Sequence, residues 1–233
     1  MSHATIRSYL LNGLHSDDIF PYDLDESVSP PIESHPFPPF LPPDATIMMM
    51  GSMPPTPDKW GMEFHYPNFS NDMWRIYGRV FFDDADHFRK GDEKGFDPKL
   101  IKAFLKERGI ASCPTVRRAI REQGNASDKH LTIVETVDFE HILPQVPKVK
   151  TIFTTGGKAT EILLELLPAD VRPKLPKTNQ EVDFPFGDRE LKLYRLPSTS
   201  RAYPQSLDKK VAAWRAFFEH VGKLDSKSDD LPI

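Results

Sequence analysis

Side chains that can orient a polar ligand are concentrated between residues 51 and 72 of this 233-residue chain. An apolar run at residues 47–50 precedes them and is short enough to be a buried strand. Gly51 and the Pro54-Pro55 pair end that strand, because proline cannot extend a ladder. The following loop carries a dense set of aromatic rings and hydrogen-bonding groups: Trp60, Phe64, His65, Tyr66, Asn68 and Asn71. Ligands of open α/β sheets bind beyond the carboxyl ends of strands, so we predict the chemistry here.

Two motifs in this order resemble those of the uracil-DNA glycosylase superfamily. The first has a Gly51-Ser52-Met53-Pro54 turn, then Tyr66, Asn71 and Trp74, as in the mismatch-specific and hypoxanthine-directed branches. The second, LPSTS at residues 196–200, is similar to the Pro-Ser loop with which these enzymes press on DNA. Residues 109–111 and 118–124 also resemble the middle of the hypoxanthine-directed branch. The resemblance covers roughly residues 35–222.

The resemblance implies excision of a deaminated base, uracil or hypoxanthine, by water attack at the sugar C1′ of a flipped nucleotide. Tyr66 or Phe64 would stack on the base, and the peptide N–H groups around Ser52 and Met53 would bind a base carbonyl. The expected base-binding residues are Gly51, Ser52, Met53, Phe64, Tyr66 and Gly156. Gly156 belongs to a glycine turn between a strand and a helix, where exposed amides can meet a polar base edge, although most such turns only cap helices.

Contacts to the DNA backbone are expected from the second motif and one lysine. Hydroxyl groups of Ser198 and Ser200 would hold phosphates, and residues 199–203 would fill the gap left by the flipped nucleotide. The expected DNA-binding residues are Lys158, Pro197, Ser198, Thr199, Ser200 and Arg201.

The residues that orient the attacking water are expected to be Asn71 and Glu63. Asn71 matches the asparagine used by the hypoxanthine-directed branch, and an amide suffices because an oxocarbenium-like transition state needs an oriented water more than a strong base. Glu63 and Asp72 are nearby carboxylates, although Asp72 equally suits a helix cap, as Asn71 alone would. Met53 stands where the best-known branches have Asp or Asn, and Leu196 where the uracil enzymes have His. Both differences predict slow chemistry.

Composition restricts the remaining possibilities. The single Cys113 excludes an internal disulfide and a cysteine-ligated iron–sulfur cluster, and the histidines lack metal-ligand spacing, so we expect no metal and no cofactor. No apolar run has transmembrane length, which favours a soluble cytoplasmic protein without membrane contact. We further expect a monomer that associates with the nucleoid during repair. A net charge of −4 disfavours nucleic-acid binding unless a local basic face compensates. The candidates for such a face are Arg117, Arg118, Arg121, Lys158, Arg195, Arg201, Lys209 and Lys210.

The order of elements predicts a three-layer α/β/α sandwich with a central, mainly parallel sheet. Strands are expected at residues 47–50, 110–113, 150–155, 181–186 and 191–196. Helices are expected at residues 72–82, 97–109, 138–143, 159–167 and 205–221. Residues 117–123 are read as a polar loop or single helical turn. Residues 1–34 are expected to be a loosely ordered arm, 35–222 one glycosylase-like domain, and 223–233 a mobile tail.

Two other functions remain open from the sequence. A nucleic-acid-binding protein that kept the fold and lost catalysis would accommodate Met53 and the acidic charge. A hydrolase of a small nucleoside-like metabolite would use the same pocket without duplex DNA, which the weak basicity favours.

Overall fold

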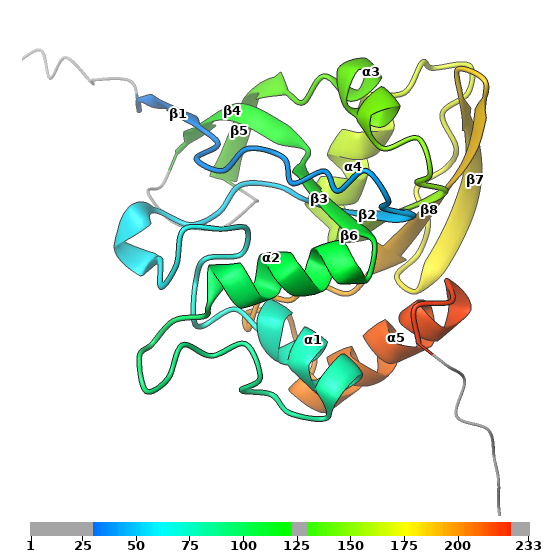
Figure 1. Cartoon of the computed structure of the whole chain (residues 1–233). Coiled ribbons are helices and arrows are strands. Elements are labelled where there is room, and N and C mark those ends of the chain that lie inside the picture. Colours follow the sequence, from blue (N-terminus) through cyan, green and yellow to red (C-terminus); the bar gives the residue numbers. More distant parts are fainter. Residues whose placement is uncertain (1–29, 123–129, 225–233) are drawn as a thin grey trace, which may run out of the picture.

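A five-stranded sheet with the strand order β3-β2-β6-β8-β7 forms the middle layer of the protein (Figure 1). The computed structural model describes residues 30–122 and 130–224. The strands of this sheet are β2 (Ile47–Gly51), β3 (Ile110–Pro114), β6 (Thr151–Thr155), β7 (Gln180–Phe186) and β8 (Arg189–Leu196). Four of them run parallel, and β7 pairs antiparallel with β8 at the edge. The carboxyl ends of β3, β2, β6 and β8 therefore meet at one edge of the sheet.

The sheet is covered on both faces, as the sequence predicted. Ile47 and Met49 of β2 pack into one apolar cluster, and Met48 and Met50 pack into another. Because successive side chains of a strand point to opposite faces, an unbroken apolar run such as residues 47–50 needs a layer on each side. The helical layers supply that cover and complete the α/β/α sandwich.

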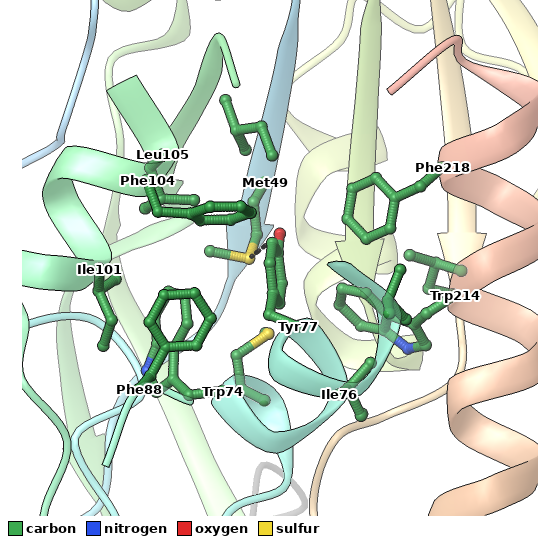
Figure 2. Close-up of a cluster of buried hydrophobic side chains, with 14 of the residues drawn as sticks. Met49, Trp74, Ile76, Tyr77, Phe88, Ile101, Phe104, Leu105, Trp214 and Phe218 are labelled. Atoms are coloured by element: carbon green, nitrogen blue, oxygen red, sulfur yellow. Dashed lines mark hydrogen bonds between the residues drawn. The ribbon is translucent and has the colours of Figure 1, made fainter. Parts of the chain in front are cut away.

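Helices α1, α2 and α5 lie on one face of the sheet, and α3 and α4 lie on the other (Figure 1). Their bounds are α1 (Met73–Phe82), α2 (Pro98–Glu107), α3 (Phe139–Ile142), α4 (Gly157–Glu165) and α5 (Leu207–His220). Two short 3₁₀ helices are η1 (Pro57–Lys59) and η3 (Leu143–Gln145). Figure 2 shows the first core, in which the Tyr77 hydroxyl of α1 donates to the Met49 sulfur of β2 at 3.6 Å. This contact fixes α1 against the strand that precedes the loop of interest.

Helix starts follow the local sequence closely. The side chain of Asp97 accepts hydrogen bonds from the peptide N–H groups of Lys99 and Leu100, and Pro98 occupies the first helical position of α2. This arrangement is the favoured N-cap followed by proline. Ser206 caps α5 through the peptide N–H of Lys209 in the same way.

A second sheet corrects the prediction for residues 117–123. Its strands are β1 (Ile32–Ser34), β4 (Val116–Arg121) and β5 (Leu131–Thr136), in the order β1-β4-β5. Val116 and Ala119 of β4 are buried against Ile162 of α4, whereas the arginines between them face solvent. A register shift between β4 and β5 breaks the strict alternation that would reveal a strand in the sequence.

The expected arm and tail fall mainly outside the described residues. Residues 1–29 and 225–233 are not described, and the last residues of the predicted arm form β1, which pairs with β4. In residues 30–122 and 130–224 no helix has the length and apolarity needed to cross a bilayer.

Candidate active site

A cavity of about 260 Å³ lies at the carboxyl edge of the larger sheet. Five segments that are distant in sequence line it: His35 and Phe37 after β1, residues 51–55 at and after the end of β2, residues 65–71 before α1, the end of β3, and residues 198–202 after β8. Thr155 at the end of β6 also reaches the cavity. Both sequence motifs therefore meet where the strand order places the ligand site of an open α/β sheet.

Tyr66 is fixed across the ends of two strands. Its hydroxyl group and the Thr155 hydroxyl of β6 share a hydrogen bond of 2.6 Å. Its backbone is left-handed, with φ +56°, which is uncommon for a residue other than glycine. A Cβ on Gly51 would overlap the Tyr66 hydroxyl, so only glycine lets the ring approach the end of β2 this closely.

Asn71 lines the cavity and also accepts a hydrogen bond from the first residue of helix α1. Its Oδ1 accepts a hydrogen bond of 2.9 Å from the peptide N–H of Met73, the first residue of the helix. This bond fixes the plane of the amide and leaves the second lone pair of Oδ1 available for another donor. Asn71 thus serves as the helix cap that the sequence allowed, in a place where it also faces the cavity.

The Pro-Ser motif forms a tight loop beside Asn71. Oγ of Ser198 accepts from the peptide N–H of Ser200, and Oγ of Ser200 accepts from the peptide N–H of Ala202. Gly156, with φ +111°, packs against Ser198, where an added Cβ would lie 3.4 Å from the serine Cβ. Ser198, Thr199 and Ser200 line the cavity together with Arg201, whose side chain is 56% exposed. The hydroxyl groups of this loop therefore both shape the backbone and border the cavity.

Several expected site residues lie elsewhere. Phe64 is only 3% exposed and stacks between His65 and the apolar core, so its ring does not reach the cavity. Glu63, its neighbour, is exposed and does not line the cavity. Pro197 is buried, and Gly156 supports Ser198 from behind the lining. Lys158, in the first turn of α4, is also outside the lining.

A buried His65–Ser112 pair is a feature that the sequence analysis missed. The Nε2 atom of His65 lies 3.0 Å from the carbonyl oxygen of Pro38, which can only accept, so Nε2 carries the proton and donates. Nδ1 of His65 then accepts from the Ser112 hydroxyl. Both residues line the cavity, and the signal in the sequence was a polar serine within a buried strand.

The two histidines of the cavity lining, His35 and His65, are neutral at physiological pH. Burial, and after it repulsion from the His35 imidazole, lowers the pKa of His65 from 6.5 to about 3. Burial also lowers the pKa of His35 to about 4, against the opposing effect of its hydrogen bond to the Phe37 carbonyl. The imidazoles in the cavity lining therefore bring no cationic charge to it.

Part of the basic face expected from the sequence is used inside the protein. Lys210 is fully buried and pairs with Asp72, and Arg121 is buried and pairs with Glu33. Arg117 and Arg118 both lie within 4 Å of the Glu135 carboxylate. The exposed basic group in the cavity lining is that of Arg201. In the described part of the chain, no group of three or more acidic, cysteine or histidine side chains could hold a metal ion.

The geometry defines an α/β/α sandwich with a central, mainly parallel sheet and a cavity at the carboxyl ends of the parallel strands. A solved structure with this fold is the solution NMR structure of a protein from Methanosarcina acetivorans, described as a candidate uracil DNA glycosylase. It is 22% identical to this chain, with a TM-score of 0.56, and the alignment covers 82% of this chain and 99% of the other. No protein-family model and no curated protein matches the sequence. The likeness at this identity shows the fold.

Proposed function

We propose that the protein is a monofunctional DNA glycosylase that excises uracil or hypoxanthine from DNA, as a monomer and without a cofactor. The observation that carries this proposal is the convergence of Tyr66, Asn71 and residues 198–201 around one cavity. These are an aromatic ring, an amide that can orient water, and a hydroxyl-rich loop with an arginine. A flipped nucleotide needs one of each, for its base, its sugar and its phosphates.

The proposed reaction is hydrolysis of the N-glycosidic bond. The bond between C1′ and the base nitrogen breaks, and its electron pair leaves with the base. The second lone pair of the Asn71 Oδ1 accepts one hydrogen of a water molecule and so turns the water oxygen toward C1′. The new C–O bond forms as the sugar develops positive charge, and the water proton passes to solvent or to the departing base.

Different parts of the cavity lining bind the base and the phosphates in this proposal. Tyr66 packs on the flipped base near the end of β2. Peptide N–H groups around Ser52 and Met53 donate hydrogen bonds to the base and stabilise the negative charge that develops on it. Ser198, Ser200 and Arg201 hold the flanking phosphates.

Lys158 contacts DNA farther from the cavity, at the start of α4. Glu63 is exposed and does not line the cavity, so the proposal places the water-orienting role on Asn71, with Glu63 as the next candidate.

The chemistry is expected to be slow. Met53 lines the cavity but its thioether neither orients nor deprotonates water. Leu196 is fully buried in the apolar core, so it offers nothing to the leaving base. Each missing electrophilic or water-orienting group typically costs about 10²- to 10³-fold in kcat.

A second candidate is a hydrolase of free nucleosides or nucleotides. The observation that favours it is that Lys210 pairs with Asp72 and Arg121 pairs with Glu33 inside the protein. Arg201 is then the exposed basic side chain in the described cavity lining. A small substrate needs one or two such contacts, whereas duplex DNA is usually held by many.

The test is an excision assay on labelled duplexes that carry uracil, hypoxanthine or mismatched thymine, with alkaline cleavage of the abasic product. Asn71→Ala and Ser198→Ala are compared with the wild type, and free deoxyuridine and deoxyinosine are assayed in parallel. Excision of one lesion that is lost in Asn71→Ala supports the proposal. Turnover of the free nucleosides alone supports the second candidate. Excision that survives Asn71→Ala refutes the role of that residue, and no turnover at low salt with excess protein refutes both functions.

A further inference from the structure

A buried ion pair connects the C-terminal helix to both motifs of the cavity. Lys210 of α5 is 0% exposed, and its ammonium group donates to the Asp72 Oδ2 at 2.9 Å. The same group donates to the carbonyl oxygen of Ser200 at 2.8 Å. One lysine thus binds the residue after Asn71 and a residue of the Pro-Ser loop.

Asp72 makes two further bonds to that loop. Its Oδ1 accepts a hydrogen bond of 3.1 Å from Nε of Arg201. Its peptide N–H donates to the carbonyl oxygen of Thr199 at 3.0 Å. With the two bonds of Lys210, these contacts fix residues 199–201 relative to the start of α1.

Stability alone is a weak explanation for this arrangement. Removing two charges from water is costly, and a well-packed apolar pair of similar volume is often as stable as a buried ion pair or more so. Asp72 also stands at the N-cap position of α1, yet its side chain makes no cap hydrogen bond, whereas the Asn71 Oδ1 accepts from the peptide N–H of Met73. The carboxylate is used for the loop instead of for the helix.

We propose that Lys210 is a positioning residue that sets the distance between the water-orienting amide of Asn71 and the phosphate-holding loop. This inference rests on the proposed function for its catalytic consequence. Lys210 holds the Ser200 carbonyl directly and holds Arg201 through Asp72. The Arg201 guanidinium is thereby bound at Nε, and its terminal nitrogens extend from an exposed side chain beside the cavity. Without the lysine, the loop and α1 remain folded but lose their fixed separation.

The test compares Lys210→Met with Val211→Ala. Val211 is the next residue of α5, is buried in the apolar core and has no place in the cavity, so its truncation weakens the same helix without removing the ion pair. The first measurement is amide hydrogen exchange of residues 198–202 and 71–74 in the free protein. Lys210→Met should speed exchange in both segments by about tenfold. Val211→Ala, measured at the same interval below its own melting temperature, should leave the exchange of both segments unchanged.

The second measurement is excision of the substrate found for the wild type. Lys210→Met should lower kcat by about 10- to 100-fold and change KM by less than about threefold, because small misplacements of oriented groups affect the chemical step most. Val211→Ala should retain the wild-type kcat at a temperature where both variants are folded. If Lys210→Met does not fold, Lys210→Met/Asp72→Asn takes its place, because the double variant leaves no unpaired buried charge.

The two proposals fail in distinguishable ways. Equal exchange of residues 198–202 in Lys210→Met and Val211→Ala overturns the positioning role, whatever the activity. Faster exchange with unchanged kcat overturns its catalytic consequence. Faster exchange in Lys210→Met than in Val211→Ala, found while the wild type excises no base, retains the positioning role and refutes the proposed function alone.

Discussion

Replacing Gly51 with alanine should displace the Tyr66 ring from its place in the cavity lining. The Cβ of an alanine here would overlap the Tyr66 hydroxyl, and the next atom of that ring, Cζ, would lie 3.1 Å away. Tyr66 is held by its 2.6 Å hydrogen bond to Thr155, so the ring cannot move without breaking that bond. The conflict is steric, because Gly51 is a strand residue whose backbone does not need the left-handed region.

The size of the effect follows from three contributions. Overpacking a well-ordered site costs about 1–3 kcal/mol, and losing the hydrogen bond adds about 1 kcal/mol. Replacing glycine with alanine returns about 0.4–1 kcal/mol by restricting the unfolded chain. Gly51→Ala should therefore lower the free energy of unfolding by about 1–3.5 kcal/mol. For a chain of this length that corresponds to a fall in melting temperature of roughly 2–14 °C.

A double-mutant cycle distinguishes this reasoning from a general sensitivity of β2. Tyr66→Phe removes the hydroxyl and should cost about 1 kcal/mol by itself. In that background the alanine Cβ meets only the ring carbon at 3.1 Å, which a shift of a few tenths of an ångström relieves. The double variant should be more stable than the sum of the single effects by about 1–2 kcal/mol, measured by urea unfolding. Additive costs would show that the Tyr66 hydroxyl does not restrict position 51.

Two further predictions concern Asn71 and His65. Asn71→Ala should lose the cap of α1, which costs about 1 kcal/mol of stability, and should lower the excision rate at least about 10²-fold. Asn71→Ser keeps a cap acceptor and should lose only the excision. Wild-type excision in Asn71→Ser would contradict the water-orienting role. The folded His65 has a pKa of about 3 and the unfolded one about 6.5, so the unfolded chain takes up a proton first and stability falls as the pH drops below 6.5. Between pH 7 and 4.5 this histidine should account for about 2.5 kcal/mol of the loss, and urea unfolding of His65→Asn should show a loss that is smaller by about that amount. An equal loss in wild type and variant would contradict the burial of a neutral imidazole.

The sequence was most informative where local chemistry and tertiary structure agree. The apolar run at residues 47–50 predicted a strand buried on both faces, and Asp97-Pro98 predicted the start of α2. Order along the chain then predicted that the two motifs meet, because parallel strands bring their carboxyl ends to one edge. These features depend on short stretches, which a sequence displays directly.

Features that depend on which way a side chain turns were beyond the sequence. Phe64 and Tyr66 are both aromatic residues of one loop, yet the left-handed backbone of Tyr66 directs its ring to the cavity while Phe64 packs in the core. Lys210 was expected on a basic surface, although its ammonium group is buried. Neither composition nor periodicity contains the partner atoms that decide these orientations.

Asn71 and Asp72 divide two tasks at the start of α1. The Asn71 amide oxygen accepts from the peptide N–H of Met73, the first residue of the helix. The Asp72 carboxylate makes no cap hydrogen bond and instead accepts from Lys210 and Arg201. The start of α1 is thereby held to the helix by one residue and to the Pro-Ser loop by the next. An exchange of the two residues would keep the composition and an acceptor for the N–H of Met73, but it would remove the carboxylate that binds Lys210 and Arg201.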